Sequence, residues 1–143
     1  MKRDLHYKKV LELNAEKALN AVSDFEKYID FVPGCTAAAS IVQDSNFEIG
    51  RLDFNFLGKE YFIKSRNEIA KNSIKIEQIE GPFIFFNAEW SAKEVKNDLC
   101  EIAFNAEFEL PFLLNAITPQ PLIEAFSNNV IESFLKKLSL IHI

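Results

Sequence analysis

The stretch 99–110, LCEIAFNAEFEL, contains the most regular pattern in the chain. Apolar side chains occupy every second position, and the positions between them are mostly charged or amide residues. The apolar set is Cys100, Ile102, Phe104, Ala106, Phe108 and Leu110. Because successive side chains of a strand point to opposite faces of a sheet, this alternation predicts a β-strand with one buried and one solvated face.

The segments before this stretch show the same alternation and are separated by short turns. Turn residues stand at Gly58, at 71–72, at Gly81-Pro82 and at 96–98. Between them we predict strands over 51–56, 59–69, 73–79 and 83–95. In the last of these, the apolar face is expected to hold Ile84, Phe86, Ala88, Trp90 and Ala92. Consecutive strands with short turns indicate an antiparallel meander with one solvated face.

Helical spacing dominates both ends of the chain. After a strand over 4–12, residues 14–22 form a predicted helix capped by Asn14, and 23–32 form a second short helix. Pro119 and Pro121 prevent an unbroken helix from 112 onward, so the long C-terminal helix is expected to begin near Pro121. Its apolar stripe consists of Leu122, Ile123, Phe126, Val130, Ile131, Phe134 and Leu138.

This order of elements predicts an α+β fold. About seven antiparallel strands would form a curved sheet wrapped around the long C-terminal helix, with two short helices after the first strand. With 143 residues, the chain is expected to be a single domain, 1–143. A sheet that grips one helix can leave an interior gap, and the 14 phenylalanines are candidates for its walls.

The composition limits the classes of partner. The formal net charge of −5 argues against nonspecific nucleic-acid binding, and we expect no DNA partner. A local basic patch is not excluded, because Lys2, Arg3, Lys8 and Lys9 lie near the start and 136–137 near the end. No segment resembles a secretory signal or a membrane span, and the two cysteines form no close pair. We therefore expect a cytoplasmic protein with reduced thiols.

Cys35 follows Pro33-Gly34 and raises the question of a reactive thiol. Nucleophilic catalysis requires a base within reach, and the two histidines, His6 and His142, lie near opposite ends of the chain. We interpret Cys35 as a small apolar residue that starts a strand, and Pro33-Gly34 as the hinge before it. No catalytic residue, metal-ligand spacing or glycine-rich phosphate loop is found, so no cofactor or metal is expected to be required.

Several stretches resemble a known family. They are SDFEKYIDFVPGC at 23–35, KSRNEI at 64–69, EGPF at 80–83, Trp90, and the strand at 99–110. Together they resemble the coenzyme Q-binding proteins and the bacterial ribosome-association toxin, a branch of the START-like superfamily of polyketide cyclases and lipid-transport proteins. The resemblance covers nearly the whole chain and implies a helix-grip (Bet v 1-like) fold.

The chain departs from that family's pattern at three places. Ile29 replaces a usual proline, Ala92 replaces a common aromatic residue, and 118–121 introduces a break before the last helix. The second and third changes would alter the lining and one mouth of a cavity. They bear on the size and identity of the ligand.

The resemblance implies a ligand cavity between sheet and helix. Its expected lining residues are Phe54, Tyr61, Ser65, Arg66, Phe86, Trp90, Phe104, Phe108, Phe126 and Val130. An apolar cavity with few polar groups suits ubiquinone or another polyprenyl lipid. The strand at 59–69 is polar on both faces, so two registers stay open. Tyr61, Ser65 and Asn67 face inward in one, and Lys64, Arg66 and Glu68 in the other.

Three functions follow from the resemblance. The first is non-enzymatic binding of ubiquinone or a similar lipid in support of respiratory electron transport, by a protein in the cytoplasm or peripheral at the inner face of the bacterial membrane. The alternative is a toxin or regulator that binds the large ribosomal subunit and blocks subunit association. The third is a cyclase-like enzyme, which would need acid and base groups inside the cavity. The sequence does not define an oligomeric state.

Overall fold

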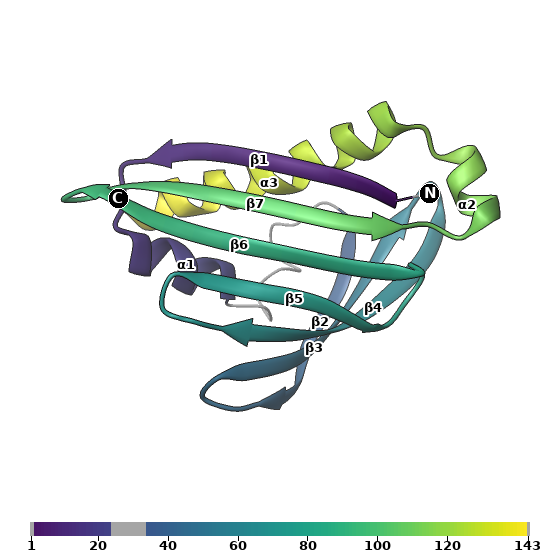
Figure 1. Cartoon of the computed structure of the whole chain (residues 1–143), viewed down its shortest axis with the longest axis horizontal. Helices are drawn as coiled ribbons and strands as arrows, with labels where there is room; N and C mark the ends of the chain where they lie inside the picture. Colours follow the sequence, from purple (N-terminus) through teal and green to yellow (C-terminus); the bar gives the residue numbers. More distant parts are fainter. Residues whose placement is uncertain (1, 24–33, 143) are drawn as a thin grey trace.

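One seven-stranded antiparallel sheet forms the body of the protein (Figure 1). The computed structural model describes residues 2–23 and 34–142; at positions 134, 135 and 137–142 it describes the backbone alone. The spatial order of the strands is β1-β7-β6-β5-β4-β3-β2. Their bounds are β1 Lys2–Leu11, β2 Cys35–Gln43, β3 Phe47–Phe56, β4 Lys59–Ile69, β5 Ser73–Glu80, β6 Phe85–Lys96 and β7 Leu99–Glu109. The predicted curved sheet is therefore confirmed.

Three helices accompany the sheet in the described ranges: α1 Ala15–Ser23, α2 Phe112–Ile117 and α3 Gln120–His142. Asn14 caps α1 as predicted, because its side-chain oxygen accepts a hydrogen bond from the Lys17 amide at 2.9 Å. The second short helix expected at 23–32 lies outside the described residues. The proline-containing break separates α2 from α3, and none of these helices has the length and apolar content that a membrane span requires.

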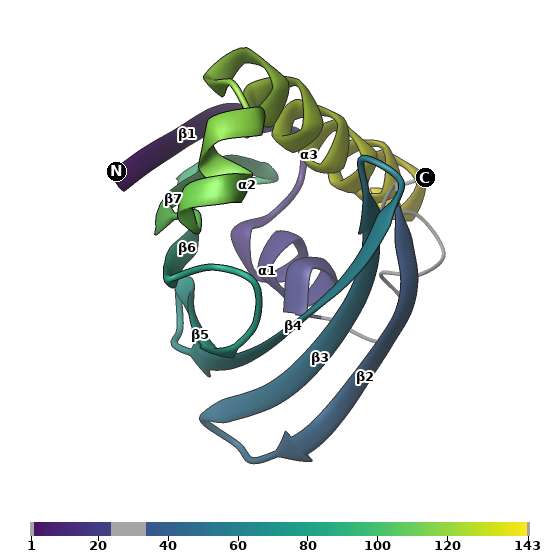
Figure 2. The same ribbon diagram turned by 90° about the vertical axis from the view of Figure 1, so that its right-hand side faces the viewer.

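The alternation in the last strand decides which side of the sheet is buried. Cys100, Ile102, Ala106 and Phe108 are buried along β7, together with Leu110 just beyond its end. On β6, Trp90 and Ala92 follow the same pattern. This shared inward face faces the helices, as Figure 2 shows from the end of the molecule.

The prediction for Ile84 was wrong. Ile84 precedes β6 and is 59% exposed, so it does not belong to the buried face. The Gln78 side chain binds both backbone groups of Phe83, accepting from its amide at 3.2 Å and donating to its carbonyl at 2.8 Å. This bend directs Phe83 into the apolar cluster of Phe86 and Phe108 and leaves Ile84 outside.

Gly34 makes the turn into β2 that the sequence predicted. Its φ is +81°, and its carbonyl accepts a hydrogen bond from the Asn55 amide at 2.8 Å. A Cβ at this position would lie 2.9 Å from the Asn55 carbonyl oxygen. Glycine satisfies both the backbone angle and this close approach. Cys35 then begins β2, whereas Pro33 lies outside the described residues.

Two apolar clusters hold the inner face together at opposite ends. At one end, α1 packs against β5, β6 and β7 through Ala18, Leu19 and Val22. At the other end, Phe108 and Leu110 pack with Ile123 of α3. The sheet curls around the helices, so that the turn between β3 and β4 comes close to α3 (Figure 2).

Candidate ligand-binding site

A cavity of about 280 Å³ lies between the inner face of the sheet and α3. We call it the apolar chamber. Its walls come mainly from β3, β6 and β7 on one side and α3 on the other. They include Leu52, Phe54, Phe56, Tyr61, Ile63, Phe83, Phe86, Trp90, Phe104, Phe108, Leu110, Leu114, Thr118, Ile123, Phe126, Ser127 and Val130. Nearly all of this surface is apolar.

Eight of the ten side chains expected from the sequence line this chamber. They are Phe54, Tyr61, Phe86, Trp90, Phe104, Phe108, Phe126 and Val130. Aromatic contacts fix several of them, including Trp90 with Phe104 at a ring-centroid separation of 4.7 Å. Phe56 meets Phe126 edge to face at 5.1 Å, which connects the curled part of the sheet to α3. The chamber is therefore lined by rings from distant parts of the chain.

A second cavity of about 160 Å³ adjoins the first and has polar groups in its wall. We call it the polar chamber. Glu48, Ser65 and Asn67 supply buried polar groups from β3 and β4, and Ser23 at the end of α1 also lines the chamber. Leu52, Ile63, Ile76, Phe86 and Trp90 line both chambers. A ligand can thus place an apolar part in one chamber and a polar part in the other.

The structure decides the register of β4. Ser65 and Asn67 point inward and are buried, so Ser65 lines the polar chamber. The prediction that Arg66 lines the cavity was wrong. Arg66 lies on the outer face, where its guanidinium carbon is 4.0 Å from the centre of the Phe47 ring and its Nε donates to Glu68 Oε1 at 3.3 Å. On the outer face the guanidinium keeps its hydration and has both a ring and a carboxylate as partners.

Glu48 is the residue that sequence reasoning missed. It is 7% exposed, and its Oε2 accepts hydrogen bonds from Ser40 Oγ at 2.7 Å and Gln43 Nε2 at 3.1 Å. The available signal was its parity with Leu52 and Phe54, which share the inward face of β3. Glu48 and Gly50 interrupt the apolar alternation on this face, so the predicted strand over 51–56 did not reach Glu48.

The end of the cavity near α2 carries exposed apolar side chains. Leu114 and Thr118 line the apolar chamber, and Thr118 Oγ1 is buried without a partner among the described residues. Phe112, Leu113 and Ile117 are 82%, 78% and 65% exposed. The break at 118–121 therefore places one residue in the cavity wall and a short apolar helix beside it.

Arg3 holds this end in place. It is 7% exposed, and its guanidinium donates to the Asn115 side-chain oxygen at 2.7 and 3.0 Å and to the Asn115 carbonyl at 3.1 Å. Arg3 does not contribute to the local basic patch that the sequence left open, because its side chain is buried. Lys2 and Lys8 remain outside and pair with Glu107 and Glu101 at 3.3 and 3.7 Å.

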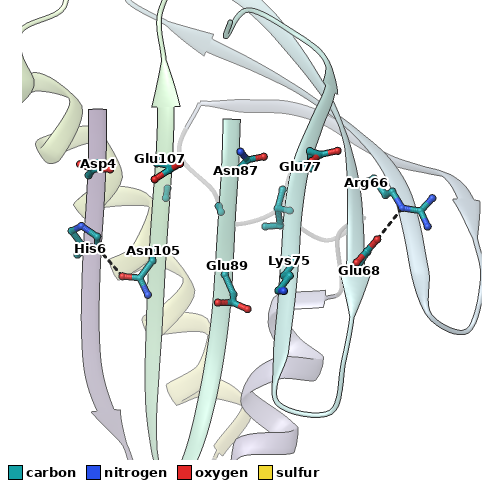
Figure 3. A pocket seen from close by; sticks show the side chains of 13 residues that line it. Asp4, His6, Arg66, Glu68, Lys75, Glu77, Asn87, Glu89, Asn105 and Glu107 are labelled. Carbon is teal, nitrogen blue, oxygen red and sulfur yellow. Dashed lines mark hydrogen bonds and ion pairs between the residues drawn. The ribbon is translucent and has the colours of Figure 1, made fainter. Parts of the chain in front are cut away.

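A wider hollow of about 480 Å³ lies on the outer face of the sheet (Figure 3). Figure 3 shows its polar side chains in two rows across the strands β1, β7, β6, β5 and β4. Several bind each other: His6 Nδ1 lies 2.7 Å from Asn105 Oδ1, and Arg66 pairs with Glu68. Most of these side chains are exposed or half-buried, so the hollow is a solvated polar surface.

Neither cysteine has the surroundings of a nucleophile. Burial raises the pKa of the half-buried Cys35 thiol, a hydrogen bond with the backbone of Ala37 lowers it, and the negative charge of Asp53 raises it further. Burial also raises the pKa of Cys100, with a further contribution from Glu94. A reactive cysteine requires a lowered pKa. The geometry supports the interpretation of Cys35 as the start of β2.

The model of the family described as "Polyketide cyclase / dehydrase and lipid transport" matches residues 11–136. The chain belongs to this family. The match includes both chambers except for Leu5 of β1. The sequence-based assignment to the START-like superfamily is thus confirmed.

Several proteins that are similar to this chain in sequence are named as toxins. The chain is 25% identical over 122 residues to the persistence and stress-resistance toxin PasT of Escherichia coli, covering 85% of this chain and 77% of that protein. It is 24% identical, with the same coverage, to the ribosome association toxin RatA of Escherichia coli. The RatA protein of Vibrio cholerae is 19% identical over 90% of both chains.

Solved structures share the fold. The aromatase/cyclase Zhui from Streptomyces has a TM-score of 0.84 at 15% identity, covering 97% of this chain and 94% of that one. A START superfamily protein from Mycobacterium smegmatis has a TM-score of 0.75 at 18% identity, with 94% and 93% coverage. At these identities the likeness shows the helix-grip architecture alone.

Proposed function

We propose that this protein is a non-enzymatic binding protein for a hydrophobic small molecule with one polar end, held between the sheet and α3. The observation that carries the proposal is the pair of adjoining chambers, one almost wholly apolar and the other containing Glu48, Ser65 and Asn67. Burial of an apolar ligand surface provides the driving force, and a few polar groups orient the ligand.

Within this class, we propose ubiquinone or a related polyprenyl lipid, bound in support of respiratory electron transport. Taken together, the chambers of about 280 and 160 Å³ lie in the lower part of the roughly 300–1,000 Å³ range of most small-molecule sites. The ring and the first part of the tail would therefore occupy the interior. The rest of the tail would leave near α2, where Phe112, Leu113 and Ile117 are exposed.

Two measurements test this proposal. Lipids extracted from purified protein are identified by mass spectrometry, and short-chain quinones are titrated while the fluorescence of the sole tryptophan, Trp90, is recorded. We expect a co-purified prenyl lipid and saturable quenching, since Trp90 lines both chambers. If no lipid is recovered and neither the quinones nor any other apolar compound changes the fluorescence, the proposal is wrong.

We propose association with the large ribosomal subunit as a second candidate function. The names of the RatA relatives favour it, since these proteins match this chain over 77–90% of their own length. The charges of the described surface give it little support, because Lys2 and Lys8 are paired with carboxylates and Arg3 is buried. Cosedimentation with ribosomal subunits at physiological salt is the test, and protein found only in the ribosome-free fractions would refute it.

A further inference from the structure

The polar chamber contains two side chains that are directly paired across neighbouring strands. Glu48 of β3 and Asn67 of β4 are register partners, and both are more than nine-tenths buried. Side chains of directly opposed residues have Cβ atoms about 4.5–5.5 Å apart. Gly50 lies on the same face and has no side chain to fill the space beside Ser65. One small group of a ligand can therefore reach both Glu48 and Asn67.

Glu48 provides a hydrogen-bond acceptor. Ser40 Oγ and Gln43 Nε2 both donate to the same oxygen, Oε2. Within the described ranges no donor reaches the other oxygen, Oε1. A carboxylate oxygen only accepts hydrogen bonds. The chamber thus presents an acceptor that has no donor among the described residues, and a ligand that shields it from water without pairing it loses affinity.

Asn67 provides the complementary donor. Its Oδ1 accepts a hydrogen bond from Ser65 Oγ at 2.9 Å, so its amide nitrogen is oriented away from Ser65. The nitrogen carries two hydrogens, and no acceptor for them is found in the part of the chain that the structure describes. The pair therefore presents one acceptor and one donor to the same small space.

We propose that the polar chamber selects a hydroxyl group, so that the ligand is a phenol or the reduced, hydroquinone form of a quinone. The hydroxyl donates to Glu48 Oε1 and accepts from Asn67 Nδ2. A quinone carbonyl or a methyl ether only accepts, and it leaves the carboxylate oxygen unpaired. A ligand carboxylate would add a second negative charge beside Glu48. The proposal rests on the proposed function and specifies the class of its ligand.

The test compares two probes that differ only in this group: 4-hexylphenol and its methyl ether, 4-hexylanisole. Each is titrated into the wild-type protein while Trp90 fluorescence is recorded. We expect the phenol to bind at least about tenfold more tightly, the effect of one hydrogen bond to a charged group. Equal affinities for the two probes would overturn the proposal and leave the proposed function standing.

Two variants test whether Glu48 and Asn67 cause the preference for the phenol over its methyl ether. In Glu48→Gln, Ser40 and Gln43 retain the amide oxygen, and the amide nitrogen turns toward the ligand. The free acceptor thereby becomes a donor, so the preference for phenol should disappear or reverse. Asn67→Leu should also reduce the preference. Glu68→Gln is the matched control, because Glu68 follows Asn67 in sequence but lies on the outer face, paired with Arg66.

The outcomes separate the two claims. If neither probe binds the wild-type protein, the proposed function fails together with this inference. If both variants unfold cooperatively like the wild type and retain its full preference for phenol, the hydroxyl lies elsewhere and this inference alone fails. A variant that does not fold leaves the wild-type comparison as a sufficient test, since that comparison requires no substitution.

Discussion

Tyr7 joins the first strand to the last helix through one hydrogen bond. Its hydroxyl donates to Glu132 Oε1 at 2.7 Å. Burial raises the pKa of Tyr7 from 10.0 to about 12, and the hydrogen bond and the negative charge of Glu132 act in the same direction. Because the folded-state pKa is raised, this bond contributes full stability below pH 10, and the contribution is lost as the pH rises toward 12.

We therefore expect Tyr7→Phe to lower the free energy of unfolding by a constant amount below pH 10 and by progressively less above it. Denaturant unfolding of both proteins across this pH range measures the difference. Glu132→Gln is the control, because it keeps an acceptor but removes the charge and should lower the pKa of Tyr7. A difference that grows between pH 10 and pH 12 would contradict the assignment.

At the scale of single residues, the sequence predicted the apolar lining far better than the polar groups. Phe54, Phe104 and Phe108 lie on strands whose opposite positions are charged or amide, so alternation alone assigns their face. Such contrast is missing where both faces are polar, as at Ser65 and Arg66. Glu48 was not singled out, because nothing in the sequence near it shows that Ser40 and Gln43 would bind it.

At the scale of elements, the turn before β2 allows a controlled test of glycine. Gly34 and Gly58 have similar φ angles, +81° and +78°. A Cβ at Gly34 would lie 2.9 Å from the Asn55 carbonyl oxygen, whereas nothing lies within 4 Å of a Cβ at Gly58. Gly58→Ala thus reports the backbone angle alone, and Gly34→Ala adds a steric clash.

We expect Gly58→Ala to reduce the free energy of unfolding by about 1 kcal/mol, and Gly34→Ala by clearly more, about 2–4 kcal/mol. Chemical denaturation of the two variants measures both values. Equal losses would mean that the turn before β2 can move away from Asn55 without cost, and that the close approach does not hold the hinge.

Short elements escaped prediction for a physical reason. Phe112, Leu113 and Ile117 make 112–117 look like the start of a core helix, but these side chains are exposed. The bend at Phe83 was also missed, because the Gln78 side chain that fixes it is not part of any periodic pattern. Periodicity reports burial of long elements, whereas side-chain hydrogen bonds to the backbone place short ones.

The contact between β1 and α2 gives a second prediction at this scale. Asn115→Ala removes the side-chain oxygen that two guanidinium nitrogens of Arg3 bind. We expect a loss of about 1.5–3 kcal/mol, because a buried charged group loses hydrogen bonds. Hydrogen exchange should show faster opening of 112–118.

Lys2→Ala is the control for this contact. Lys2 precedes Arg3, and its ion pair with Glu107 is about half exposed. Its loss should cost less than about 1 kcal/mol and leave exchange in α2 unchanged. If Asn115→Ala behaved like Lys2→Ala, Arg3 would not be what holds α2 at the end of the cavity.

At the scale of the whole molecule, the curled sheet separates an apolar space against α3 from a polar space against β3 and β4. Val130 of α3 lines only the apolar chamber, whereas Glu48 lines only the polar one. A change in each chamber should therefore affect a different property of binding. The volume of the apolar chamber determines how tightly both hexyl probes bind. Glu48 and Asn67 determine the ratio of the two affinities.

Val130→Phe tests this separation by placing a larger side chain in the cavity of about 280 Å³. We expect both 4-hexylphenol and 4-hexylanisole to bind at least about tenfold more weakly, a loss of about 1.4 kcal/mol, with their ratio unchanged. Stability should change little, because the added ring enters existing space rather than a packed core. Asn129→Phe adds the same ring at the neighbouring exposed position and should leave both affinities intact. Unchanged binding in Val130→Phe would place the hexyl chain outside the apolar chamber, and a changed ratio would show that the two chambers act as one.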